Sequence, residues 1–121
     1  MKAKKTLVLG ASLKPNRYSN LAILRLTENN IPTVAFGLRS GSVASIPIDT
    51  QLRPYPDIHT VTLYLNPNRQ KEYYNYILSL QPQRVLFNPG TENPELMELL
   101  DEQGISYELA CTLTLLATGQ Y

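Results

Sequence analysis

The sequence contains one cysteine, one histidine and no tryptophan among its 121 residues. Because Cys111 has no second cysteine to bond with, an internal disulfide is excluded. Cys111 and His59 are also too few for a zinc site, which draws its ligands from a cluster of such residues. We therefore expect neither a disulfide framework nor a bound metal.

The chain also lacks a long apolar run. No stretch approaches the roughly 20 apolar residues that cross a bilayer, and the basic start Met1-Lys2-Ala3-Lys4-Lys5 runs into a strand-like segment without a signal-peptide core. We expect a cytoplasmic protein that makes no membrane contact. A composition of 43% hydrophobic and 17% charged residues is typical of folded globular proteins. The length fits one domain with its own core, so we predict a single domain over residues 1–121.

Two common phosphate-binding motifs are missing. The dinucleotide fingerprint G-x-G-x-x-G needs three glycines, but the positions that should follow Gly10 hold Ser12 and Pro15. No P-loop pattern occurs, which excludes NTP hydrolysis by that route. The second expected strand ends in Phe36-Gly37-Leu38-Arg39, with no carboxylate for ribose hydroxyls. Arg39 suits a ribose phosphate instead, which rejects NAD and leaves NADP or coenzyme A as candidate ligands.

Short β-favouring runs alternate with helical segments along the chain. Buried strands are expected at 6–10, 33–36, 60–65, 84–87 and 105–109, and helices from Ser19 to Asn29, from Asn66-Pro67 to near Pro82, and from Asn93-Pro94 to Gly104. The proline-containing segment 37–57 is expected to be irregular, with at most a short strand near 46–48. This alternation predicts an α/β protein: a small doubly wound Rossmann-like fold with a five-stranded, mostly parallel sheet and helices on both faces.

The turn after the first strand combines a glycine with hydroxyls and cations. Ligands of doubly wound folds bind outside the carboxyl ends of the strands, and free amides at a helix start favour phosphate. Ser12 and Ser19 would donate hydroxyls, while Lys14 and Arg17 would neutralise negative charge. The turn is therefore a candidate phosphate site, with an ordinary strand-to-helix turn as the alternative.

Charge is distributed unevenly along the chain. Residues 1–48 hold seven basic side chains and one acidic one, a balance of +6, whereas residues 49–121 hold four basic and nine acidic ones, a balance of −5. This split indicates an anionic partner on the N-terminal half, and a dipolar surface without a partner is the alternative. The basic residues are interleaved with apolar ones, which favours a compact phosphate-bearing ligand.

A family resemblance rests on the order of short motifs. Leu9-Gly10-Ala11-Ser12 is followed by Arg17-Tyr18-Ser19, then by a loop with Gly41 and Ile46-Pro47-Ile48, and then by two strand-helix units ending at Cys111. In this order the chain resembles the small stand-alone CoA-binding domain family. Its members are Rossmann-like proteins related to the CoA-binding domain of the succinyl-CoA synthetase alpha subunit. The resemblance spans roughly residues 5–114.

The resemblance implies a coenzyme A site at the carboxyl edge of the sheet. The diphosphate would lie against the first turn, the adenosine end would face the second strand end, and the adenine or pantetheine would border the loops after the third and fourth strands. With Lys14, which the charge of the first turn indicates, the candidate site residues are, in chain order, Gly10, Ala11, Ser12, Lys14, Arg17, Ser19, Arg39, Ser40, Asn66, Pro67, Asn88 and Gly90.

Residues with catalytic potential are few. His59 stands beside Asp57 with no serine or cysteine near it in sequence, so no catalytic role is expected. Cys111 lies in an apolar segment, which is typical of a buried cysteine. The alternative, a reactive thiol that forms a disulfide with CoA, would need exposure and a lowered pKa.

The remaining polar clusters fit structural roles. The acidic residues of the third expected helix suit a solvated face: Glu92, Glu95, Glu98, Asp101 and Glu102. Tyr73 and Tyr74 share an apolar face with Ile77 and Leu78 and have no basic stripe beside them, so no nucleic-acid partner is expected.

The sequence thus predicts non-catalytic binding of coenzyme A or an acyl-CoA through the first strand-to-helix turn. Two alternatives stay open: an NADP- or nucleotide-binding protein on the same fold, including an enzyme, and an interaction domain that has lost its ligand. The open sheet edges would also allow a homo-oligomer.

Overall fold

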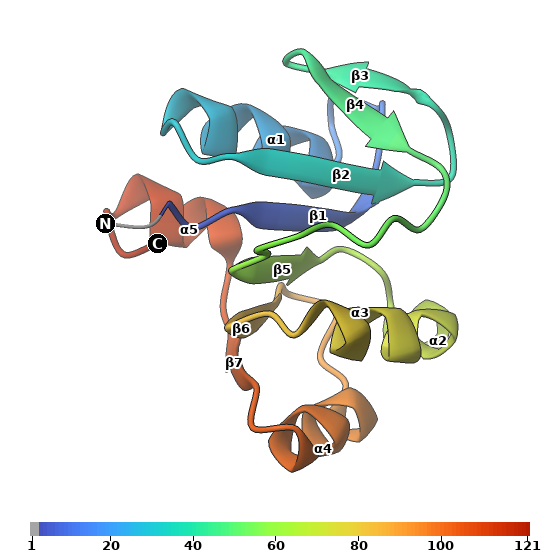
Figure 1. The fold of residues 1–121 in the computed structure, drawn as a ribbon. Coiled ribbons are helices and arrows are strands. Elements are labelled where there is room, and N and C mark those ends of the chain that lie inside the picture. Colours follow the sequence, from blue (N-terminus) through green and yellow to red (C-terminus); the bar gives the residue numbers. More distant parts are fainter. Residues whose placement is uncertain (1–2) are drawn as a thin grey trace.

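One sheet separates two layers of helices (Figure 1). The computed structural model describes residues 3–121, and Met1 and Lys2 of the basic start lie outside these described residues. The elements in chain order are β1 (Thr6–Ala11), α1 (Tyr18–Glu28), β2 (Thr33–Gly37), β3 (Gly41–Val43), β4 (Ile46–Asp49), β5 (Thr60–Leu63), α2 (Pro67–Gln70), the 3-10 turn η1 (Lys71–Tyr73), α3 (Tyr74–Leu80), β6 (Arg84–Phe87), α4 (Pro94–Glu102), β7 (Ser106–Leu109) and α5 (Thr112–Ala117). None of the helices within residues 3–121 has the length and apolarity to span a membrane.

The sheet is parallel except at one edge. Its strand order is β3-β4-β2-β1-β5-β6-β7, and only β3 runs antiparallel to its neighbour, β4. Leu9 of β1 is in register with Phe36 of β2 and with Leu63 of β5, which in turn pairs with Phe87 of β6. These strands therefore end along one edge. The chain leaves β1 toward β2 and later returns to β5 on the other side, so the switch point of the topology lies between β1 and β5.

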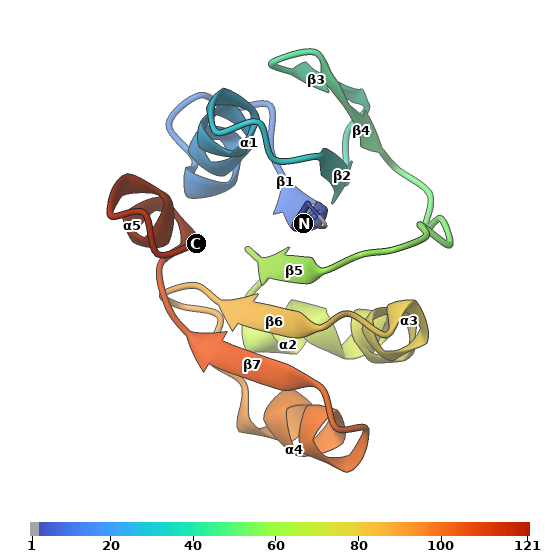
Figure 2. The ribbon, with the colours of Figure 1, turned by 60° about the vertical axis from the view of Figure 1, so that its left-hand side comes forward.

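Alternate residues of the central strand face different helix layers, as the period of two in a strand requires. Leu7 and Leu9 are fully buried with Ile77, Leu96 and other residues on the face covered by α2, α3 and α4. Val8 is fully buried with Ile23 and other residues on the face covered by α1 and α5. Figure 2 shows α1 and α5 together on one side of the sheet. The continuous apolar runs of the sequence are explained by this burial on both faces.

The helix starts predicted from asparagine and proline are confirmed, but the single helix expected from Asn66-Pro67 to near Pro82 is divided into α2, the 3-10 turn η1 and α3. The Asn66 side chain accepts a hydrogen bond from the Arg69 amide at 2.9 Å and begins α2. The Asn93 side chain accepts from the Glu95 and Leu96 amides and begins α4. In each case proline follows at the first helical position, where its missing N–H costs nothing.

The prediction of five strands is wrong, because the sheet has seven. The segment 37–57, expected to be irregular, contains the β3–β4 hairpin. Its turn residues Ala44 and Ser45 have φ values of 49° and 66°. Primed hairpin turns normally carry glycine or asparagine at such positions, so alanine and serine there do not indicate a turn. Val43 and Ile48 nevertheless bury themselves in the core beneath α1, which stabilises the hairpin.

Two helix predictions also need correction. Helix α5 was not predicted, because it is only six residues long and its N-cap residue, Cys111, makes no side-chain capping bond. Ser19 is not the N-cap of α1: Arg17 holds that position, and Ser19 lies inside the first turn with only 4% of its surface exposed.

Near the carboxyl end of β1 the neighbouring backbone and side chains leave no room for a side chain at two positions, Gly10 and Gly37. Gly10 has a φ of +100° at a register shift between Leu9 and Ala11, a conformation that favours glycine. A methyl group on Gly37 would lie 2.3 Å from the Ala11 carbonyl oxygen. The end of β2 therefore fits against β1 only because residue 37 is glycine.

Substitution of Gly37 with alanine is expected to lower the free energy of unfolding by about 2–4 kcal/mol, because the added methyl overlaps a backbone oxygen that cannot rotate away. Urea unfolding followed by circular dichroism measures the change. Ser42→Ala, an exposed substitution on β3, is the matched control and should alter stability by less than about 0.5 kcal/mol. Wild-type stability of Gly37→Ala would refute the close packing of β1 and β2.

Candidate functional site

The turn between β1 and α1 is held by bonds of its own. The Ser12 hydroxyl accepts a hydrogen bond from the Lys14 amide at 3.1 Å, and the Arg17 amide donates to the Lys14 carbonyl at 3.1 Å. Asn20, which is 5% exposed, donates from its side chain to the Ser12 carbonyl at 2.9 Å. The backbone of the turn is thereby fixed to the first turn of α1.

The start of α1 carries no anionic or capping partner of its own. Arg17 makes no side-chain capping bond, and the first turn of the helix contains no acidic residue. Lys14 and Arg17 are exposed. The ion pairs found in residues 3–121 join Arg25 to Glu28 and Arg53 to Asp49, so neither cation of the turn is paired there. An uncapped helix start beside two exposed cations suits a phosphate group.

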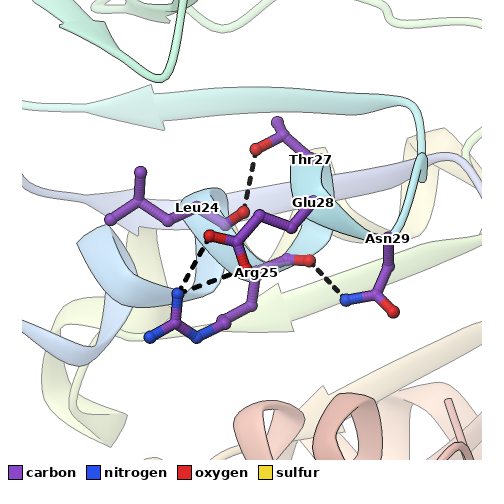
Figure 3. Close-up of polar contacts among 5 residues, drawn as sticks. All are labelled: Leu24, Arg25, Thr27, Glu28 and Asn29. Carbon is purple, nitrogen blue, oxygen red and sulfur yellow. Dashed lines mark hydrogen bonds and ion pairs between the residues drawn. The ribbon is translucent and has the colours of Figure 1, made fainter.

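The C-terminal end of the same helix is different (Figure 3). Arg25 Nη1 lies 3.1 Å from Glu28 Oε1, and Asn29 Nδ2 donates to the Arg25 carbonyl at 2.7 Å. The Thr27 hydroxyl donates to the Leu24 carbonyl at 2.9 Å. Arg25 is thus an exposed cation of α1 that has a carboxylate partner, which makes it a natural control for Arg17.

Exposed apolar side chains accompany the cations of the turn. Five large apolar residues of the described chain are exposed, and three of them lie near the cations: Leu13 and Leu38 on the loops that follow β1 and β2, and Tyr18 at the start of α1. Tyr18 is 63% exposed and Leu38 is 67% exposed. Because exposure cannot be read directly from sequence, Leu13, Tyr18 and Leu38 were not among the predicted site residues. Their position within three residues of Lys14, Arg17 or Arg39 was the signal that could have pointed to them.

The loop after β2 reaches the turn after β1. A methyl group on Gly41 would lie 2.7 Å from Leu13 Cδ2, so Leu13 covers this glycine closely. Arg39 and Ser40 immediately precede Gly41 and are exposed. The structure therefore brings the predicted residues Arg39 and Ser40 beside the turn that carries Lys14 and Arg17.

The loop after β5 lies against Gly10. The Tyr64 amide donates to the Leu9 carbonyl at 2.9 Å, and a methyl on Gly10 would lie 3.0 Å from Leu65 Cδ2. The missing side chain of Gly10 thus makes room for another loop of the protein. Asn66 and Pro67 follow directly, with Asn66 exposed and its side-chain oxygen engaged in capping α2.

Asn88 is enclosed by other parts of the chain. It is 3% exposed, and its Nδ2 donates to Thr62 Oγ1 at 2.7 Å and to the Leu63 carbonyl at 2.9 Å. Its Oδ1 accepts from the Thr112 amide at 2.8 Å. These bonds join β5, β6 and the start of α5. Gly90, two residues further on, is exposed with φ +92° and faces open space.

The predicted site residues thus fall into three groups of differing exposure. The exposed ones are Lys14, Arg17, Arg39, Ser40, Asn66 and Gly90; the partly buried ones are Gly10, Ser12 and Pro67; the buried ones are Ala11, Ser19 and Asn88. The exposed members of the first two loops form an open surface. Two hollows of the described surface lie elsewhere, one of about 380 Å³ beside α4 and β7 and one of about 270 Å³ between α1 and α5. Neither hollow is lined by a predicted site residue.

His59 lies away from this surface, while Cys111 is partly buried at the N-cap of α5. His59 precedes β5, at the amino ends of the strands, where its Nδ1 lies 2.7 Å from Thr60 Oγ1. Burial, with the nearby charges of Arg84 and Lys4, lowers the pKa of His59. Burial raises the pKa of the Cys111 thiol, but hydrogen bonding to Thr114 and to the Leu113 backbone outweighs it and leaves this pKa below its ordinary value.

Comparison with known proteins identifies the family. The model of the CoA-binding domain matches residues 4–117. The chain belongs to this family, which confirms the resemblance seen in the sequence and supports coenzyme A binding in general.

Solved structures share the fold of this chain. A crystal structure of an uncharacterized protein is 45% identical with a TM-score of 0.96, and the match covers 100% of both chains. A hypothetical protein from Pyrococcus horikoshii is 25% identical with a TM-score of 0.83 over 93% of this chain and 81% of that one. A Thermus thermophilus protein, 21% identical over 98% of this chain and 91% of that one with a TM-score of 0.84, shares the fold. No curated protein matches the chain.

Proposed function

We propose that this protein binds coenzyme A or an acyl-CoA without acting on it, and that the turn between β1 and α1 holds the diphosphate. One observation carries the proposal: two unpaired cations and three exposed apolar side chains share one surface at the carboxyl ends of β1 and β2. Coenzyme A combines phosphates with an aromatic base, so a surface of this mixed character suits it. Membership of the CoA-binding domain family supports the same ligand.

The diphosphate end of the proposed site is built from the first turn. The Tyr18 and Ser19 amides lie at the uncapped start of α1 and would donate to phosphate oxygens. Lys14 would contribute charge, and Arg17 would contribute charge and a two-pronged contact. Gly10, Ala11 and Ser12 would line this end by their backbone, with the Ser12 hydroxyl beside them.

The adenosine end lies toward the loop after β2. Arg39 and Ser40 would contact the ribose phosphate, and the exposed faces of Tyr18 and Leu38 would pack on the base. Asn66, Pro67 and Gly90 would border the rest of the ligand. The side chains of Ser19 and Asn88 would support the site from inside the protein, because both residues are buried and the hydrogen bonds of Asn88 are satisfied by the protein.

A role without catalysis is supported by what surrounds this surface. His59 lies at the amino ends of the strands. The carboxylates of α4, which are Glu95, Glu98, Asp101 and Glu102, lie beside β7 rather than β1. A general acid or base must reach the reacting atoms within hydrogen-bond distance. The loops after β1 and β2 hold no histidine, cysteine or carboxylate.

NADP is the second candidate ligand. It carries a diphosphate and a ribose phosphate, so Arg17 and Arg39 would serve it in the same way. The comparison of CoA with NADPH therefore belongs in every binding measurement.

Arg17→Ala is expected to raise the dissociation constant for coenzyme A by about tenfold or more, because it removes a charged hydrogen-bond donor from the diphosphate. Isothermal titration calorimetry with CoA, NADPH and NAD in parallel measures the change. Arg25→Ala is the matched control: it removes an exposed arginine from the same helix and should leave the affinity unchanged.

Tight binding of CoA with no effect of Arg17→Ala would place the diphosphate elsewhere. Absence of binding to all three ligands by the folded protein would contradict the proposal and favour an interaction domain. Preference for NADPH over CoA would favour the second candidate.

Arg39→Ala is expected to weaken binding of CoA by about tenfold but to leave dephospho-CoA, which lacks the ribose phosphate, nearly unaffected. Titration of CoA and of dephospho-CoA into the wild type and into Arg39→Ala gives a double-mutant-type cycle for the contact between Arg39 and the ribose phosphate. An equal loss for the two ligands would show that Arg39 acts on some other part of the site.

A further inference from the structure

The two edges of the sheet differ in what they present to solvent. The β3 edge is three residues long, and its tight hairpin turns Val43 into the core. The opposite edge, β7, is four residues long and ends in Leu109, which is 61% exposed. A short edge without exposed apolar side chains is protected from pairing, whereas an open edge with one is not.

The outward backbone groups of β7 follow from its pairing with β6. The Ala110 amide donates to the Phe87 carbonyl at 3.1 Å, so even-numbered residues direct their backbone groups toward β6. Residues 105, 107 and 109 therefore direct theirs away from the sheet. The Ile105 amide is already bonded to the Leu100 carbonyl at 2.9 Å. The edge thus offers both groups of Tyr107, both groups of Leu109 and the carbonyl of Ile105.

Leu109 lies on the same face of β7 as the hollow beside α4. Ile105 and Tyr107 pack with the core beneath α4, and Leu109 lies on the same face by the period of two. The hollow of about 380 Å³ beside α4 is lined by Asp101, Gly104, Ile105, Ser106 and Tyr107. An exposed apolar side chain and a hollow therefore lie at the two ends of one open strand, on one face.

We propose that β7 pairs antiparallel with β7 of a second copy of this chain, about a two-fold axis at Tyr107. In this arrangement the two Tyr107 residues exchange backbone hydrogen bonds, and each Leu109 amide donates to the partner's Ile105 carbonyl. Leu109 then lies opposite the partner's Ile105 and enters the hollow there, and the symmetry repeats the contact.

The side chains select this register over its neighbours. Centring the axis on Glu108 would set two Glu108 carboxylates directly opposite each other, which is unfavourable. Centring it on Ser106 would carry Leu109 past the partner's strand. Centring it between residues would pair side chains of opposite faces. Centring on Tyr107 instead sets Glu108 opposite the partner's Ser106, where a hydroxyl can donate to the carboxylate.

The interface would be small and acidic. Pairing of a short strand places it at the low end of protein interfaces, so association is expected in the micromolar to millimolar range. In the proposed pairing each Glu108 lies diagonally across the axis from the partner's Glu108. Salt should therefore strengthen the dimer by screening this repulsion.

Sedimentation velocity over a concentration series up to about 1 mM tests the interface. The wild-type protein should pass from monomer to dimer, and Leu109→Asp should stay monomeric, since it places a second carboxylate beside the partner's Asp101 in the hollow. Leu52→Asp is the matched control, because Leu52 is 44% exposed on a distant loop, and it should dimerise like the wild type. A wild type that stays monomeric, or equal dimerisation of Leu109→Asp, would overturn the proposal.

The register is tested by cross-linking on a Cys111→Ser background. Ser106→Cys and Glu108→Cys are both exposed changes, and the two variants mixed together should form a disulfide-linked heterodimer, since opposite residues of an antiparallel pair lie within disulfide reach. Each variant alone should link more slowly. Faster linking of either variant with itself would contradict the axis at Tyr107.

Discussion

The close packing of β2 and of the loop after β5 against the end of β1 is the constraint on which the candidate site depends. On one side Gly37 brings β2 so near that a methyl would lie 2.3 Å from the Ala11 carbonyl oxygen. On the other side Leu65 and Tyr64 cover Gly10, whose φ of +100° bends the chain out of the strand. Because both neighbours approach so closely, the chain must leave the sheet between them. It does so as the exposed turn that carries Lys14 and Arg17.

Buried amides fix the other loops of the same edge. Gln70 is fully buried, and its Nε2 donates to the Leu65 and Thr91 carbonyls at 2.8 Å each, while its Oε1 accepts from Asn93. Asn88 joins β5 and β6 to α5 in the same manner. Fully satisfied polar networks of this kind make the backbone around them rigid. The loops after β5 and β6 are therefore held in place by these hydrogen bonds, whereas the loops after β1 and β2 carry the exposed charged groups.

Sequence patterns predicted the parallel strands and the capped helices because their signals are local. Asn66 and Asn93 followed by proline, and continuous apolar runs, have direct physical meaning at those positions. The β3–β4 hairpin escaped prediction because Ala44 and Ser45 adopt positive φ without a glycine or asparagine. Its stability comes from Val43 and Ile48, which pack on distant residues. Helix α5 escaped because six residues without a cap carry no local signal.

The charged residues of the candidate site could be named from the sequence, but the exposure of its other members could not. Lys14, Arg17 and Arg39 are exposed, as a phosphate site requires. Tyr18 and Leu38 were missed because an apolar residue in a sequence is ordinarily assigned to the core. Ser19 and Asn88 were assigned to the ligand surface but are buried, since a polar residue gives no sign in sequence of whether its partner is the protein or a ligand.

The most direct measurement of the central claim is a titration of the isotope-labelled protein with coenzyme A, followed by amide chemical shifts. If the turn after β1 holds the diphosphate, the largest shifts will fall in residues 10–20 and 37–41, with smaller ones at 64–67. Shifts centred on the hollow between α1 and α5, or on the α4–β7 edge, with the turn unaffected, would contradict that claim.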